Sequence, residues 1–434
     1  MSHDSINESD PGTVDNSVTP DAFRFSKRRL RVEIFPVTTL ILAQYGTLAI
    51  VPALVHKTAP LALIIGICLA GFGGAFATEA LIAPIGRSKR EAPLVDWAIA
   101  RWVLIIGLVS QLAVAASGRL SYATQIGTGT QSPLASYATP LQYWSIIGVA
   151  LLLWTYRAGG IARSRVLVLL LVTMGIQLVI AIVNARLGPF TIFAFTVVFL
   201  GLLVRLIRFR WVLVLLMIAS LALPTFFSIR NQSRINAGAN AASVNSATVS
   251  NRFRIDLEIA QIQRFPTIPA AIPLPSLAKL LEFGLIPSVF DAGRGSLASG
   301  ESLSVALGGS NTNAASLTTL GEIYAYYGWW GVIAYVVLGA ILLGYLIRRP
   351  GAWIFCIFTL AVSQLFFIEA TVPDVFAGFL QSLISLLFAF ILYALLKPKD
   401  GKDGRFFRTR TGNLTEELPR VNVLNPRRAD DRLH

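Results

Sequence analysis

The sequence predicts an all-α polytopic membrane protein with about ten transmembrane helices and one large extracytoplasmic loop. Of its 434 residues, 54% are hydrophobic and only 14% are charged, and the mean hydropathy is +0.64. This apolar content exceeds what the core of a soluble protein of this length requires. The basic residues also gather on one predicted side of the membrane, which gives the chain an orientation.

Ten apolar runs come close to the ~20 residues that a helix needs to cross a bilayer. They lie at 36–55, 60–84, 94–116, 141–156, 166–184, 189–207, 211–228, 322–347, 352–371 and 375–396. The run at 141–156 is the shortest. Cys68 and Cys356 both fall inside these runs, so we expect neither a disulfide nor a metal site at them.

The orientation follows from the distribution of lysine and arginine. With both termini in the cytoplasm, the predicted cytoplasmic segments hold 26 of the 37 basic residues, ten lie on the outer side, and Arg101 lies within a span. This is the positive-inside pattern of a multi-pass protein of the plasma (inner) membrane. The net charge of +14 therefore reports topology, and we expect no nucleic-acid partner.

The spans and the charge pattern divide the chain into four segments. Residues 1–31 read as a disordered cytoplasmic tail with a basic end, because they are polar and contain no signal-peptide core. A transmembrane domain follows at 32–396, and 397–434 form a second basic cytoplasmic tail. Within the domain, 228–321 form an outer loop of about 90 residues, the only predicted soluble part large enough to hold a site.

Arginines on the outer side are the first candidates for a binding site. Arg186 lies in a tight turn between two spans, and the large loop carries further candidates at Arg230, Arg234, Arg252 and Arg254. Guanidinium groups bind phosphate bidentately, and positive charge in an outer loop does not help the topology. The alternative is that these arginines contact lipid headgroups or pair with acidic residues of the loop.

Glu322 is the second candidate, because it precedes a long apolar helix. A helix over 320–347 would be roughly 42 Å long at 1.5 Å per residue, longer than a ~30 Å hydrocarbon core. Its first turns should therefore stand beside the outer loop. The alternative is a capping box, in which Thr319 is the N-cap and Glu322 hydrogen bonds back to it.

Further polar and aromatic residues on the outer side are candidates as well. Gln364 and Glu369 in the ninth predicted span, with Asp374 and Gln381 around the tenth, are expected to line the outer half of the last hairpin. Candidates for contact with a sugar are Tyr324, Tyr327, Asn311 and Asn313. For the tyrosines, the alternative is an aromatic belt at the membrane interface.

The stretch from Gly321 to Arg349 resembles the C-terminal region of O-antigen polymerases, the Wzy-type oligosaccharide repeat-unit polymerases. In that family a Gly-Glu-x-Tyr leads through an aromatic residue and a Gly-x-x-Gly into a span that ends in a basic pair. Here these are Gly321-Glu322-Ile323-Tyr324, Gly328 with Gly331, and Arg348-Arg349. The arginine in a short outer turn and those opening the large loop are also similar, so the likeness covers about 165–396.

The resemblance implies a GT-C-like fold and a glycosyltransferase that polymerises undecaprenyl-diphosphate-linked repeat units into O-antigen, capsule or exopolysaccharide. It implies no metal and no other cofactor. Glu322 would take a proton from the attacking hydroxyl, and the outer arginines would stabilise the departing diphosphate. The implied partners are the lipid-linked oligosaccharide and membrane lipid, with a chain-length regulator and a flippase as further candidates.

Three other classes stay open. O-antigen ligases share the architecture, but they carry a histidine near the end of the large loop, where this chain has none. Other polytopic glycosyltransferases that use lipid-linked sugars have an acidic motif in the first outer loop, which here reads VHKTAP. A transporter or flippase would place charged or broken helices at mid-membrane and would not need a 90-residue outer loop.

Overall fold

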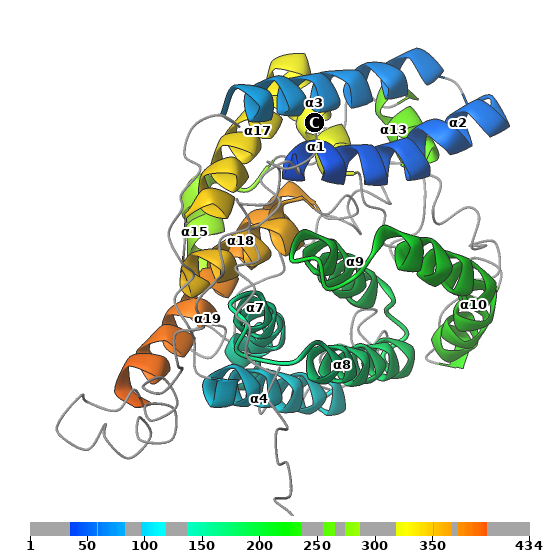
Figure 1. The fold of residues 1–434 in the computed structure, drawn as a ribbon. Helices are drawn as coiled ribbons and strands as arrows, with labels where there is room; N and C mark the ends of the chain where they lie inside the picture. Colours follow the sequence, from blue (N-terminus) through cyan, green and yellow to red (C-terminus); the bar gives the residue numbers. More distant parts are fainter. Residues whose placement is uncertain are drawn as a thin grey trace, which may run out of the picture. The chain divides into compact units, whose positions relative to one another are not determined.

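The computed structural model describes residues 35–58, 60–82, 97–118, 137–236, 241, 255–264, 274–286, 318–349, 351–366 and 371–396 (Figure 1). These residues form helices and short connections, and they contain no strand. Residues up to Phe390 belong to one compact unit. Ile391–His434 form a second unit, of which the structure describes only the end of the last helix. The all-α prediction is confirmed for the described part of the chain.

Each of the ten predicted apolar runs contains a helix. In chain order the elements are α1 (Pro36–Ile41), η2 (Leu42–Ile50), α2 (Val51–His56), α3 (Leu61–Ile82), α4 (Trp97–Ala116), η3 (Thr139–Leu141), α7 (Trp144–Arg157), α8 (Arg163–Val183), α9 (Gly188–Leu203), α10 (Phe209–Asn236), α13 (Ile255–Arg264), α15 (Leu277–Leu285), α17 (Thr319–Arg348), α18 (Ala352–Leu365) and α19 (Val372–Leu396). The first run is continuous but changes to a π-helix at η2. Two helices, α13 and α15, lie in the segment predicted to be the large loop.

Among the residues that the structure describes, six helical segments are long and apolar enough to cross a membrane, which identifies a polytopic membrane protein. They are Pro36–His56, Leu61–Ile82, Trp97–Ala116, Arg163–Val183, Thr319–Arg348 and Val372–Leu395. The apolar helices α9 and α18 have 16 and 14 residues, so they are only about 24 and 21 Å long. The count of ten spans stays a prediction.

The helix α10 extends further than the apolar run that predicts it. The run ends at 228, but the helix continues to Asn236 and passes through Pro224. Arg230 and Arg234 are therefore on the last turns of a helix, where the sequence pattern placed them in a loop.

The packing of α3 against α17 depends on small residues. These two helices lie side by side (Figure 1). A Cβ on Gly66 would lie 2.8 Å from the Trp329 ring, and one on Gly74 would lie 3.0 Å from Val336. Glycines on one face of a helix let the neighbouring side chains approach closely, and this contact positions the helix that carries Glu322.

The shortest predicted span, α7, is the most enclosed helix. All of its residues are buried, and it contacts α4, α8, α9 and α18. The backbones of α4 and α7 are in direct contact at Gly107. A Cβ on this residue would lie 2.0 Å from the Ser145 nitrogen. A helix that is apolar on all sides is typical of such a central position.

Candidate functional site

Glu322 lies in the first turns of α17 and bonds to a different helix. Its side chain is only 5% exposed, and its Oε2 accepts a hydrogen bond of 2.5 Å from the backbone nitrogen of Val372. Val372 is the first residue of α19. The first N–H groups of a helix have no partner within the helix, so Glu322 satisfies one of them from outside.

The capping-box interpretation of Glu322 is wrong in its register. The N-cap of α17 is Thr318, whose Oγ1 accepts a hydrogen bond of 3.0 Å from the nitrogen of Gly321. With the cap one residue earlier than predicted, Glu322 falls one position beyond the place from which a capping glutamate reaches back. Its carboxylate is therefore not needed to cap its own helix.

A second carboxylate, Asp374, stands at the same end of α19. Thr371 Oγ1 donates to Asp374 Oδ2 at 2.8 Å and accepts from the Asp374 nitrogen at 3.4 Å. Asp374 and Glu322 are close enough to interact electrostatically. The positive end of the α19 dipole favours both negative charges, so this helix N-terminus brings two carboxylates together.

Arg186 is a cation that interacts with Asp374 of this pair. It lies in the turn between α8 and α9, is half-buried, and interacts electrostatically with Asp374. Burial lowers the pKa of the Arg186 guanidinium, and the charge of Asp374 acts in the opposite direction. Because arginine has so high a pKa, the side chain stays cationic. A predicted diphosphate ligand and the predicted base are thus linked through Asp374.

The end of α10 joins the same turn. Arg234 Nε donates a hydrogen bond of 3.2 Å to the carbonyl oxygen of Ala185, the residue before Arg186. Ala185 has a φ of 54°, which is unusual for a residue with a side chain. Arg230 lies one turn earlier on α10, is buried, and stacks over Phe227 with 4.9 Å from its Cζ to the ring centre. Of the predicted arginines, Arg234 is therefore bonded to the turn that carries Arg186, and Arg230 lies one helical turn away on α10.

Polar side chains of α19 and of the segment before α7 continue the site. Tyr143 is the residue before α7, and its hydroxyl donates to Gln381 Oε1 at 3.5 Å. Tyr143 also interacts electrostatically with Asp374. The amide nitrogen of Gln381 donates to the carbonyl oxygen of Phe283 at 2.8 Å. This last bond attaches α15, from the predicted loop, to the helix that carries Asp374.

The predicted sugar-contacting tyrosines differ in exposure. Tyr327 is 62% exposed and is available to a ligand. Tyr324 is half-buried and packs edge-on against Trp329, with 4.8 Å between the ring centres. Asn311, Asn313, Arg252 and Arg254 lie outside the described residues, so their predicted roles stay predictions.

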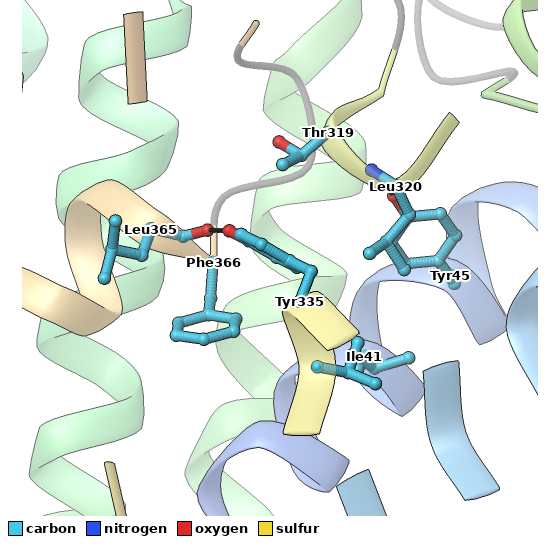
Figure 2. A pocket seen from close by; sticks show the side chains of 8 residues that line it. Ile41, Tyr45, Thr319, Leu320, Tyr335, Leu365 and Phe366 are labelled. Carbon is cyan, nitrogen blue, oxygen red and sulfur yellow. Dashed lines mark hydrogen bonds between the residues drawn. The ribbon is translucent and has the colours of Figure 1, made fainter. Parts of the chain in front are cut away.

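A cavity of about 20 Å³ lies beneath the first turn of α17, as Figure 2 shows. It is bounded by Tyr45, Leu320, Tyr335 and Phe366, among others. The hydroxyl of Tyr45 accepts from the Leu320 nitrogen at 3.1 Å, and the hydroxyl of Tyr335 donates to the Leu365 carbonyl (Figure 2). This space has room for about one water molecule. It is too small for a sugar. The Tyr45 hydroxyl instead fixes the start of α17, and the Tyr335 hydroxyl joins α17 to the end of α18.

Two residues of the π-helix η2 support the site through hydrogen bonds. The sequence pattern did not single them out. Tyr45 holds the first turn of α17, and Gln44 Nε2 donates to the carbonyl oxygen of Phe366 at 2.9 Å, just after α18. No sequence pattern indicates a π-helix at 42–50. By contrast, the spacing Thr371-x-x-Asp374 is a capping signal from which the position of Asp374 could have been predicted.

No family model, no curated protein and no solved structure matches the chain. A guanidinium in a partly desolvated turn can hold an anionic group. A buried carboxylate at a helix N-terminus can accept a proton from a hydroxyl. The site therefore combines the two functions that a glycosyl transfer from a phosphate ester requires.

Proposed function

We propose that the protein is a polymerase that joins polyprenyl-diphosphate-linked oligosaccharide repeat units into a surface polysaccharide. It acts on the outer face of the plasma membrane, with about ten spans in a GT-C-like arrangement and both termini in the cytoplasm. The proposal is supported by one juxtaposition above all: Arg186 and Glu322 both interact with residues at the N-terminus of α19. These are the two residues to which the family resemblance assigns diphosphate binding and proton transfer.

The reaction assigns a step to each of these residues. A hydroxyl of the incoming unit attacks the anomeric carbon of the growing chain, and the bond from that carbon to the diphosphate oxygen breaks. The diphosphate leaves with the electron pair, and Arg186 stabilises its charge. Glu322 takes the hydroxyl proton as general base. No group is oxidised or reduced.

When no substrate is bound, Asp374 provides a negative charge for Arg186. It interacts electrostatically with Arg186, so it keeps the guanidinium at the site and limits its cost of burial. Its charge also lies near Glu322 and favours the protonated form of that residue after the transfer. Asp374 is thus a positioning residue for both.

The length of the surface glycan tests the proposal. In a strain that lacks the protein, single repeat units should replace the ladder of polymer on a gel, and wild-type protein should restore the ladder. Lipid-linked polymer that is not transferred to its final acceptor would instead identify a ligase. An unchanged glycan would contradict both activities.

A further inference from the structure

Three arginines meet at the end of α7 remote from Tyr143. Arg157 is the last residue of α7, Arg163 is the first of α8, and Arg205 lies in the turn after α9. Nη2 of Arg163 donates a hydrogen bond of 3.0 Å to the carbonyl oxygen of Leu206. This bond joins the start of α8 to the residue after Arg205. Arg157 and Arg205 are close enough to repel each other electrostatically.

Arg157 is unusual among these because it is nearly enclosed. Its side chain is only 9% exposed, and its Nε is buried with no hydrogen-bond acceptor among the residues that the structure describes. A buried donor without a partner and a like charge nearby both disfavour the folded state. The carbonyl ends of α7 and α9 offset part of this through their dipoles, but they leave Nε unsatisfied.

The second cation, Arg205, has an exposed side chain, and the backbone of a tight turn places this residue. Arg205 has a φ of 59°, a conformation that residues with side chains rarely adopt. The turn is closed by hydrogen bonds from the nitrogens of Leu206 and Ile207 to the carbonyl oxygen of Gly201, at 2.8 and 3.1 Å. The fold therefore keeps two cations together at a place where no described carboxylate is hydrogen bonded to either.

We propose that Arg157 and Arg205 bind a phosphate group between them. Phosphate accepts charge-assisted hydrogen bonds from guanidinium groups and would neutralise the repulsion between these two cations. Two sources share this chemistry: the headgroup of an anionic phospholipid and free inorganic phosphate. Three further exposed arginines, Arg165, Arg208 and Arg210, lie in or just before the first turns of α8 and α10. Basic clusters at helix ends are typical of headgroup sites, and the site is independent of the proposed polymerase activity.

Thermal unfolding of the purified full-length protein tests the site. It is measured in phosphatidylcholine nanodiscs, in the same nanodiscs with phosphatidylglycerol added, and in phosphatidylcholine with inorganic phosphate. We expect phosphatidylglycerol to raise the unfolding midpoint of the wild type, and Arg157→Gln to weaken the apparent affinity for it about tenfold or more. A response to inorganic phosphate alone would assign the site to the free ion.

Matched variants separate binding from a structural role. In phosphatidylcholine without phosphate, Arg157→Gln should unfold at the same temperature as wild type or higher, because an unpaired buried charge is gone. Arg205→Gln should reduce the phosphatidylglycerol response, whereas a change at Arg165, an exposed arginine in the first turn of α8, should leave most of it: Arg165→Gln is the matched control. Equal responses in wild type, Arg157→Gln and Arg205→Gln would overturn the proposal.

Discussion

At the scale of single residues, Glu322 has a structural role and a proposed catalytic role, and a substitution can separate the two. Its carboxylate accepts the Val372 N–H at 2.5 Å, which is a structural role that any acceptor of the same shape can fill. The proposed transfer of a proton needs a group that titrates. A variant that keeps the acceptor and removes the titration distinguishes the two.

Glu322→Gln is that variant. The amide oxygen still accepts from Val372, so we expect the free energy of unfolding to change by about 0.3–1 kcal/mol, the interaction of the lost charge with the helix dipole. Loss of a general base lowers a rate by roughly 10²–10⁴. The expected result is normal protein in the membrane with little or no polymer on a gel.

Glu79→Gln is the matched control for that experiment. Glu79 is also a buried carboxylate that accepts backbone N–H groups at a helix start, from Val37 at 2.8 Å and Thr38 at 3.1 Å. It lies at the other end of α3 from Gly66, which packs near the α17 aromatics. Polymer should persist in Glu79→Gln. Wild-type chain length in Glu322→Gln would leave Glu322 with its structural role only.

Arg186 gives the second prediction at this scale. Arg186→Ala should abolish polymer, because the diphosphate loses its cation and Asp374 is left beside Glu322 without a counter-charge. Arg186→Lys should restore little, since a point charge does not replace a bidentate fork. Chain length and protein level are measured together, with the exposed Arg210→Ala as control. A normal ladder in Arg186→Ala at normal protein level would remove this residue from the site.

At the scale of elements, α17 is interrupted where the sequence predicted one continuous helix. Gly328 has φ 63° and ψ −157°, a region open almost only to glycine. The break separates the first turns, which carry Glu322 and Tyr324, from the apolar part of the helix. Because of this break, the turns before Gly328 can have a different axis from the apolar helix that follows it.

Gly328→Ala tests the importance of this break. Open space surrounds the position, with nothing within 4 Å of a Cβ, so the variant introduces backbone strain without a clash. We expect a loss of about 1–3 kcal/mol in the free energy of unfolding. Gly73→Ala is the control, because Gly73 also has open space but lies within a regular helix. That change should be neutral or stabilise by up to about 1 kcal/mol. Equal effects of the two variants would contradict the strain argument.

At the scale of the whole molecule, the sequence predicted those features that depend on a local pattern of residues, such as the positions of the helices. Apolar runs located the helices, since each of the ten predicted runs contains one. The helix boundaries were less predictable, because the polar end of α10 continues a helix that hydropathy ends at 228.

The contacts between residues far apart in the chain could not be predicted from sequence patterns. Arg186, Glu322 and Asp374 were each noted for their residue type, but their meeting depends on how α8, α17 and α19 pack. The bond from Glu322 to Val372 and the π-helix that supplies Tyr45 leave no periodic signal. Local spacing suggested a capping box instead, and the true cap at Thr318 differs from the predicted one by a single threonine.

The orientation of the whole chain is the last prediction, and it decides whether the site can reach a lipid-linked sugar. We expect 228–321 outside and both termini inside, because the predicted inner segments hold 26 of the 37 basic residues. Both native cysteines, Cys68 and Cys356, are buried, so a thiol label has little background. A membrane-impermeant maleimide should label Ser246→Cys in intact spheroplasts, and the exposed Ser164→Cys only after permeabilisation. The reverse pattern would place Arg186 and Glu322 on the cytoplasmic side, away from the flipped substrate, and would overturn the proposed function together with the topology.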